Sequence, residues 1–133
     1  MSYEEISVLV IDDDPTTRRI VTRLIKQIGF TTFTEAGNGE EAFAQLESTK
    51  FGLILSDWDM PVMNGLQLLE KVRSDERFQD LPFIMITAND AKENILKAVR
   101  AKVSQYIVKP FTAPALREKI DKVLKIAPPE AAA

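Results

Sequence analysis

The chain has 133 residues, of which 45% are hydrophobic and 28% charged, with a formal net charge of −3 and neither cysteine nor histidine. Since a domain usually holds roughly 100–200 residues, this length predicts one domain. Without cysteine the chain forms no disulfide and no zinc–thiolate site, and without histidine it lacks the commonest general base and transition-metal ligand. Its chemistry therefore depends on carboxylates, hydroxyls, lysines and hard metal ions.

Several classes of function are excluded by the same composition. The mild acidity argues against a nucleic-acid binder, which usually carries a basic surface. The apolar runs are far shorter than the roughly 18 residues of a membrane span, and the polar N-terminal residues 1–7 are unlike a signal peptide. We therefore expect a soluble, cytoplasmic monomer that binds neither nucleic acid nor membrane. Residues 127–133 (APPEAAA) are predicted to be a disordered tail, with the domain at residues 1–126.

Short apolar runs alternate with helical patterns along the chain. In chain order, the first half predicts a strand at 6–11 and then a helix that ends at Gly29. The inner face of this helix is predicted to contain Ile20, Val21, Leu24, Ile25 and Ile28. A weak strand at 31–34 follows, and then a helix at 39–47 with Ala42, Phe43 and Leu46 inward. The second half predicts strands at 51–55, 82–86 and 106–108, each followed by a helix. The first of these helices is marked by Leu66, Leu69 and Val72, and the second by Ile95, Ala98 and Val99. The last helix is marked by Leu116, Ile120, Val123 and Leu124.

Five successive strand–helix units predict an α/β fold. Strands that alternate with helices form a parallel sheet with right-handed crossovers and helices on both faces. Five units are too few for an eight-stranded barrel, so we expect an open, doubly wound, five-stranded sheet. Ligands of such sheets bind beyond the carboxyl ends of the strands.

Polar side chains stand at several of these predicted strand ends. They are Asp12, Asp13 and Asp14 after the first strand, Asp57 after the third, Thr87 after the fourth and Lys109 after the fifth. Asp13 and Asp57 together are suited to hold Mg²⁺, which prefers oxygen ligands, and without a metal the clustered carboxylates repel one another. Each residue also has an ordinary explanation: Asp14 before Pro15 is typical of a helix N-cap, and single threonines and lysines are usually turn or surface residues.

These positions, taken together, resemble the receiver domain of two-component response regulators. The motifs RRIV (18–21), SDWDMP (56–61), KENI (92–95) and YIVKPFT (106–112) are similar to those of the chemotaxis regulators within that family. The resemblance extends over essentially the whole predicted domain. It implies a flavodoxin-like topology with strand order 2-1-3-4-5 and five helices.

The resemblance also implies a role for each residue at the strand ends. Asp57 is the phosphoacceptor, whose carboxylate takes a phosphoryl group from a histidine kinase. The implied Mg²⁺ ligands are Asp12, Asp13, Asp57 and the backbone carbonyl of Asp59. Lys109 contacts one phosphoryl oxygen and Thr87 donates a hydrogen bond to another. The chain then acts as a signalling phosphoacceptor rather than as an enzyme with a separate substrate.

A switch and a partner-binding face follow from the same resemblance. Thr87 moves toward the bound phosphoryl group, and Tyr106 rotates inward into the space that Thr87 leaves. The residues of the partner-binding face are Lys92, Ile95, Tyr106, Val108 and Lys119. We expect this face to bind the kinase and the flagellar motor switch protein. The ordinary alternative is a half-buried tyrosine beside solvated lysines.

The sequence departs from the family pattern at a few positions. Asp59 stands where relatives commonly have an amide, and Asn89 where they commonly have an acid; both border the path of the water that hydrolyses an acyl phosphate. Asp14 adds a further carboxylate at the mouth of the site. We therefore predict that these three residues modulate metal affinity and phosphate lifetime. Lys102 and Gln105 replace glycines that often precede the last strand.

Other functions remain open from the sequence. A receiver acting as a phosphorelay intermediate or as a kinase regulator fits the same residues. A haloacid-dehalogenase-type phosphatase shares the pattern Asp12-x-Asp14-x-Thr16, but such an enzyme normally has an acidic pair where this chain has Thr87-Ala88. Flavodoxin has the same topology, but here no Ser/Thr/Gly-rich phosphate loop follows the first strand.

Overall fold

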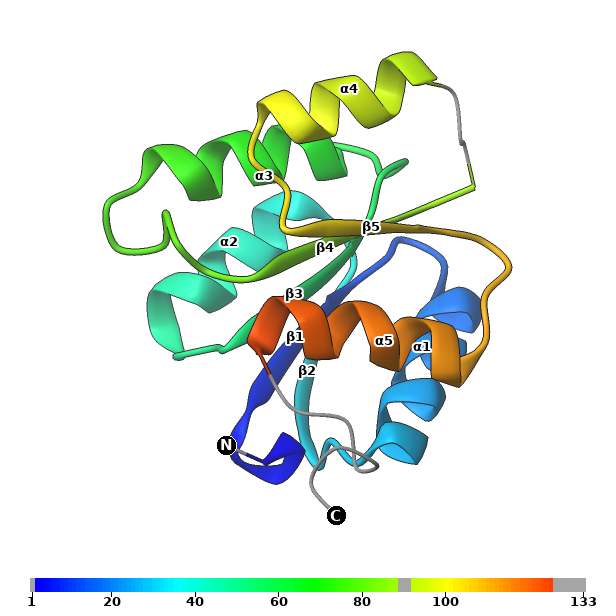
Figure 1. Ribbon diagram of the computed structural model, residues 1–133. Helices are drawn as coiled ribbons and strands as arrows, with labels where there is room; N and C mark the ends of the chain where they lie inside the picture. Colours follow the sequence, from blue (N-terminus) through cyan, green and yellow to red (C-terminus); the bar gives the residue numbers. More distant parts are fainter. Residues whose placement is uncertain (1, 89–91, 126–133) are drawn as a thin grey trace.

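Within residues 2–88 and 92–125, which the computed structural model describes, five parallel strands form one sheet in the order β2-β1-β3-β4-β5, flanked by five α-helices (Figure 1). The predicted fold and strand order are thus confirmed. In chain order the elements are the 3-10 helix η1 (Tyr3–Glu5), β1 (Ser7–Ile11), α1 (Pro15–Ile28), β2 (Thr32–Ala36), α2 (Gly39–Ser48), β3 (Leu53–Asp57), α3 (Gly65–Ser74), β4 (Phe83–Thr87), α4 (Lys92–Arg100), β5 (Gln105–Val108) and α5 (Ala113–Leu124).

The sheet separates two apolar cores. Helices α1 and α5 cover one face, and α2, α3 and α4 cover the other (Figure 1). Because successive side chains of a strand point to opposite faces, Val8 and Val10 of β1 pack in the core beneath α1 and α5, whereas Leu9 and Ile11 pack in the other core. The central strands are therefore apolar on both faces, as the runs in the sequence predict.

Two of the predicted strands end later than their apolar runs. The runs at 51–55 and 82–86 correspond to strands at Leu53–Asp57 and Phe83–Thr87. Backbone pairing continues through the polar residues, with Asp57 in register with Ile86 and Thr87 with Val108. Asp57 and Thr87 are therefore the last residues of β3 and β4, and the sheet itself holds their backbones.

The prediction that Ile20 lies on the inner face of its helix is wrong. In α1 the buried residues are Val21, Thr22 and Ile25, while the Ile20 side chain is 50% exposed. The helix is one turn longer at its start than the apolar pattern, because Pro15 already adopts the first helical position. Its inner face is centred on Val21 and Ile25, four residues apart, and Ile20 lies at its margin.

The described residues contain no helix that is long and apolar enough to cross a membrane. The predicted tail at 127–133 and the predicted modulator Asn89 lie outside the described residues.

Tyr3 joins the start of the chain to α5. Its hydroxyl donates a hydrogen bond to Asp121 Oδ1 at 2.5 Å, and its ring centroid lies 5.0 Å from that of Phe30. Asp121 is buried, and Arg117 Nε lies 3.6 Å from its other oxygen. Burial, together with the hydrogen bond to the Asp121 carboxylate, raises the pKa of Tyr3 from 10.0 to about 12. The neutral phenol is therefore the form that the folded protein prefers.

We predict that Tyr3→Phe lowers the free energy of unfolding by about 1 kcal/mol at pH 8, because the variant loses the donor to a buried carboxylate. A pKa that is higher in the folded state stabilises the fold below pH 10, and this contribution disappears as the pH rises toward 12. Urea unfolding of both proteins at a series of pH values measures the difference. A difference that stays constant across this range contradicts the assignment.

Candidate functional site

Three carboxylates meet at the carboxyl edge of the sheet. Asp12 directly follows β1, and Asp57 ends the neighbouring strand β3. One carboxylate oxygen from each of Asp12, Asp13 and Asp57 lies within 4.8 Å of the others. Asp12 is 3% exposed and Asp57 7% exposed, whereas Asp13 faces solvent. The pocket is therefore open on the Asp13 side and closed beneath by the sheet.

Lys109 brings an ammonium group to these carboxylates. It directly follows β5, and its backbone N–H donates to the Thr87 carbonyl at 2.8 Å. Its Nζ lies 3.1 Å from Asp57 Oδ1 and 3.4 Å from Asp12 Oδ2. The structure thus brings together the ends of β1, β3, β4 and β5, as the sequence predicts.

The positive charge in this pocket does not fully balance its negative charge. Burial raises the pKa of Asp57, and the nearby Asp12 carboxylate raises it further, while Lys109 opposes both effects. For Lys109, burial lowers the pKa, but attraction to Asp57 and Asp12 outweighs burial and the net shift is upward. Among the described residues, the Lys109 ammonium pairs with two of the three clustered carboxylates, Asp12 and Asp57, so the pocket keeps an excess of negative charge. An all-oxygen donor set of this kind fits a hard divalent cation such as Mg²⁺.

Close packing fixes the backbone of Asp57. Gly65, the first residue of α3, donates its N–H to the Trp58 carbonyl at 2.8 Å. A Cβ atom at Gly65 would overlap the Asp57 carbonyl oxygen and would lie 2.8 Å from Met85 Sδ. The absence of a side chain at Gly65 therefore lets α3 begin directly against the end of β3.

The structure places the two other aspartates of this region apart from the cluster. The Asp14 side chain accepts hydrogen bonds from Thr16 N at 3.0 Å and from Thr17 Oγ1 at 2.7 Å, so the predicted N-cap is confirmed. The Thr17 and Thr16 hydrogen bonds lower the pKa of Asp14. Asp59 is exposed in the loop after β3. Whether either residue modulates the site stays a prediction.

The predicted switch residues Thr87 and Tyr106 share a small cavity. Trp58, Met85 and Ile95 line it with them, and its volume is about 10 Å³. Thr87 is buried and Tyr106 half-buried. A volume of this size holds about one water molecule.

The predicted partner-face residues lie on three consecutive elements. Lys92 and Ile95 belong to α4, Tyr106 and Val108 to β5, and Lys119 to α5. Lys119 Nζ lies 5.7 Å from the centroid of the Tyr106 ring, within cation–π distance.

Arg18, which the sequence analysis noted only within the RRIV motif and gave no role, also contacts this site. Its Nη1 donates to the Asp12 carbonyl at 2.7 Å, and its Nε donates to Glu35 Oε1 at 2.9 Å. A basic residue in the first turn of a helix is opposed by the helix dipole. An unfavourably placed basic residue near the start of α1, just after three aspartates, is the feature of the sequence that points to Arg18.

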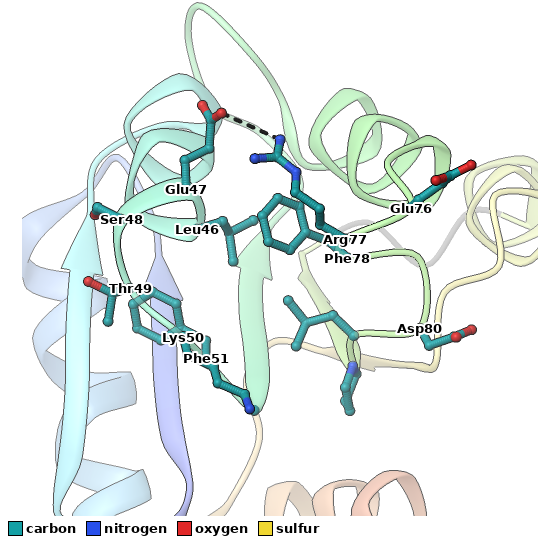
Figure 2. Close-up of a pocket in the computed structure, with 13 residues that line it drawn as sticks. Leu46, Glu47, Ser48, Thr49, Lys50, Phe51, Glu76, Arg77, Phe78 and Asp80 are labelled. Carbon is teal, nitrogen blue, oxygen red and sulfur yellow. Dashed lines mark hydrogen bonds and ion pairs between the residues drawn. The ribbon is translucent and has the colours of Figure 1, made fainter.

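A larger pocket of about 590 Å³ lies at the opposite end of the sheet, between the end of α2 and the segment before β4 (Figure 2). Phe51 and Phe78 line it, and Glu47 and Arg77, which also line it, form an ion pair of 3.4 Å (Figure 2). None of the predicted site residues lines this pocket.

The fold and the acidic pocket define a receiver domain, and comparison with known proteins agrees. The chain belongs to the response regulator receiver domain family, whose model matches residues 8–121. It is 44% identical over 118 residues to the chemotaxis protein CheY of Pseudomonas aeruginosa, a match that covers 89% of this chain and 95% of that protein. Receiver domains are signalling modules rather than conventional enzymes.

Solved structures give the same fold. The structure of chemotaxis protein CheY4 of Vibrio cholerae superposes with a TM-score of 0.82 at 28% identity, covering 89% of this chain and 98% of that one. A receiver domain of a sensor histidine kinase from P. aeruginosa, which has a magnesium ion coordinated in its active-site cleft, superposes with a TM-score of 0.82 at 22% identity, covering 90% and 98%. At 22% identity, the likeness to this receiver domain shows a shared fold alone.

We predict that Asp57→Asn raises the free energy of unfolding by about 1 kcal/mol in the absence of Mg²⁺, because it removes a buried charge next to Asp12. Since the pKa of Asp57 is raised in the folded state, protonation also relieves this penalty. The difference from the wild type is therefore full at neutral pH and shrinks on acidification.

Chemical denaturation in the presence of a chelator tests this expectation. Asp59→Asn is the matched control, because it removes an exposed carboxylate two residues away. The control is expected to change stability by no more than about 0.5 kcal/mol. An Asp57→Asn protein that is less stable than the wild type without metal contradicts the prediction.

Proposed function

We propose that this chain is a chemotaxis-type response regulator that accepts a phosphoryl group on Asp57 from the phosphohistidine of a kinase. The observation that carries the proposal is the position of the Asp57 carboxylate. It ends β3 in a pocket with Asp12 and Asp13, and Lys109 Nζ lies 3.1 Å from its Oδ1. A nucleophile, a cation-binding donor set and a second positive group are thus combined at one point.

The proposed step is an in-line phosphoryl transfer. A carboxylate oxygen of Asp57 attacks phosphorus, the P–N bond to the donor imidazole breaks, and its electron pair stays on that nitrogen. The product on this chain is an acyl phosphate. Lys109, which already reaches Asp57, then pairs with a phosphoryl oxygen as a point charge. The Thr87 hydroxyl donates to another of the oxygens.

Asp12, Asp13, Asp57 and the Asp59 carbonyl are the proposed ligands of a Mg²⁺ ion. When bound, the ion supplies charge neutralisation between the carboxylates and the incoming phosphoryl group. The exposed Asp13 leaves the ligand set accessible from solvent, while buried Asp12 fixes its inner side. Asp14, Asp59 and Asn89 are retained as proposed modulators of metal affinity and phosphate lifetime.

Phosphorylation is proposed to change the surface made of α4, β5 and α5. Tyr106 and Thr87 line the same cavity, whose volume of about 10 Å³ does not admit a phenol ring. Inward rotation of Tyr106 therefore requires Thr87 to move first, toward the phosphoryl group. Its rotation alters a face that includes Lys92, Ile95 and Lys119. This coupling is a population shift between two states.

Asp57 is expected to take phosphate from a small acyl-phosphate donor in the presence of Mg²⁺, and a chelator is expected to abolish the reaction. Intact-mass measurement followed by reductive trapping and peptide mapping locates the modified residue. Asp57→Asn gives no acyl phosphate, whereas Asp12→Asn is modified on Asp57 at a lower rate. Label on Asp12 in the wild type instead favours a haloacid-dehalogenase-type reaction and overturns the proposal.

The proposed partner is the flagellar motor switch protein, and the proposed location is therefore the cytoplasm. Its N-terminal peptide is expected to bind more tightly when beryllofluoride, a phosphoryl mimic, is added with Mg²⁺. Lys119→Ala should weaken this binding by about 1 kcal/mol. Lys122→Ala is the matched control on the same helix, since Lys122 is exposed and lies 3.3 Å from Glu118.

If beryllofluoride changes the Trp58 emission but does not increase the affinity for the peptide, the motor-switch assignment is contradicted. It favours the second candidate, a phosphorelay intermediate or kinase regulator, which uses the same phosphoacceptor.

A further inference from the structure

Arg18 ties the metal-binding loop to the edge strand β2. Its backbone N–H donates to the Asp14 carbonyl at 2.9 Å, and its guanidinium Nη1 donates to the Asp12 carbonyl at 2.7 Å. The same guanidinium donates through Nε to Glu35 Oε1 at 2.9 Å. One residue of α1 thus contacts both ends of the segment that carries Asp13.

The Asp12 peptide is fixed at each of its polar groups. Its N–H donates to the Ala36 carbonyl at 3.1 Å, and its carbonyl accepts from Arg18. Its Oδ1 accepts from the backbone N–H of Asp14 at 2.9 Å, and its Oδ2 lies 3.4 Å from Lys109 Nζ. Regular pairing of β1 with β2 ends at Ile11 and Ala36, so the Asp12 carbonyl lies past the ladder. The Arg18 guanidinium therefore donates to the Asp12 carbonyl the hydrogen bond that a further residue of β2 would donate if the pairing continued.

Fixing this carbonyl sets the direction of the next residue. A peptide unit is planar, so the orientation of the Asp12 carbonyl determines where the nitrogen and Cα of Asp13 lie. Asp13 is exposed and has no sheet pairing, and its carboxylate must nevertheless stay with those of Asp12 and Asp57. Groups that orient metal ligands in this way typically affect metal affinity by about 10- to 100-fold.

Glu35 gives the arrangement its second anchor. It lies on β2 in register with Val10 and is partly exposed, as is Arg18. An ion pair at such exposure adds little stability by itself. Its effect is geometric, because it holds the planar guanidinium so that Nη1 points at the Asp12 carbonyl. Lysine cannot reproduce this two-pronged contact.

We propose that Arg18, oriented by Glu35, is a positioning residue for the magnesium ligand Asp13, acting through the Asp12 carbonyl. The inference rests on the proposed function of the acidic pocket and assigns a role in it to β2. Arg18 does not contact the phosphoryl group or the metal. It sets the geometry of the ligand loop before either is bound.

Magnesium titration tests the proposal without any phosphorylation step. Trp58, the only tryptophan of the chain, directly follows Asp57, so its emission reports on cation binding. Arg18→Lys and Arg18→Gln are each expected to raise the Mg²⁺ dissociation constant by about tenfold. Arg19→Lys and Arg19→Gln make the same changes at the next, exposed residue and are expected to leave it unchanged.

The two Arg18 variants separate positioning from charge. If Arg18 acts only through its charge, Arg18→Lys binds Mg²⁺ like the wild type and Arg18→Gln binds it more tightly, and that result overturns the proposal. Unchanged affinity in both variants overturns it as well. If circular dichroism shows that an Arg18 variant is unfolded, Glu35→Ala decides instead: a raised dissociation constant supports the proposal, and an unchanged one overturns it.

The wild type distinguishes this inference from the proposed function. If the wild type binds no Mg²⁺, both fall together. If it binds Mg²⁺ and takes phosphate on Asp57 while the variants bind with wild-type affinity, only the role of Arg18 is wrong.

Discussion

The site depends on holding two buried carboxylates, Asp12 and Asp57, side by side with one ammonium group between them. Lys109 Nζ lies within hydrogen-bond distance of both, and without it neither buried carboxylate would have an ion-pair partner among the described residues. Burying a charge is unfavourable unless it is paired, and a single ammonium pairs with only part of this cluster. The remaining negative charge is what makes the pocket receptive to a divalent cation.

The sheet supplies the rigidity that this arrangement needs. Asp57 and Thr87 are held by strand pairing, and Lys109 is held to Thr87 through its backbone N–H. Asp12 and Asp13 both lie in the loop between β1 and α1, where the Asp12 N–H still pairs with the Ala36 carbonyl. In the proposed arrangement, the place of Asp13 depends on hydrogen bonds around Asp12, to which α1 contributes Arg18. The strands would then position the proposed nucleophile, and the loop after β1 the proposed ligands.

The sequence predicts the fold and most of the pocket because both depend on local patterns. Apolar runs mark the strands, and polar residues at their ends converge once the strands are parallel. The exposure of Ile20 was missed, because periodicity locates a helix face only to within about one residue position. A basic residue near the start of α1 draws attention to Arg18 in the sequence, but its contact with the Asp12 carbonyl depends on how α1 lies above the sheet, which the sequence pattern does not specify. Lys102 is a second example. The sequence shows only that a lysine stands where glycine is common, whereas in the structure its backbone is left-handed (φ 66°) and its carbonyl accepts a hydrogen bond from Arg73 Nε at 2.8 Å.

The switch proposed to connect the acidic pocket with the α4–β5–α5 surface is constrained by close packing. The cavity that Thr87 and Tyr106 share has a volume of about 10 Å³, far less than an aromatic ring needs. Interiors packed this closely do not deform gradually, so the ring stays out or enters fully once a neighbour has moved. Lys119 Nζ lies 5.7 Å from the centroid of the Tyr106 ring, and an inward rotation of this ring would break that contact. The proposed switch would therefore depend on two opposed contacts of Tyr106, with the Lys119 cation on one side and with the space beside Thr87 on the other. A phosphoryl group would act on the second, so that its proposed effect at the surface is a shift between two states.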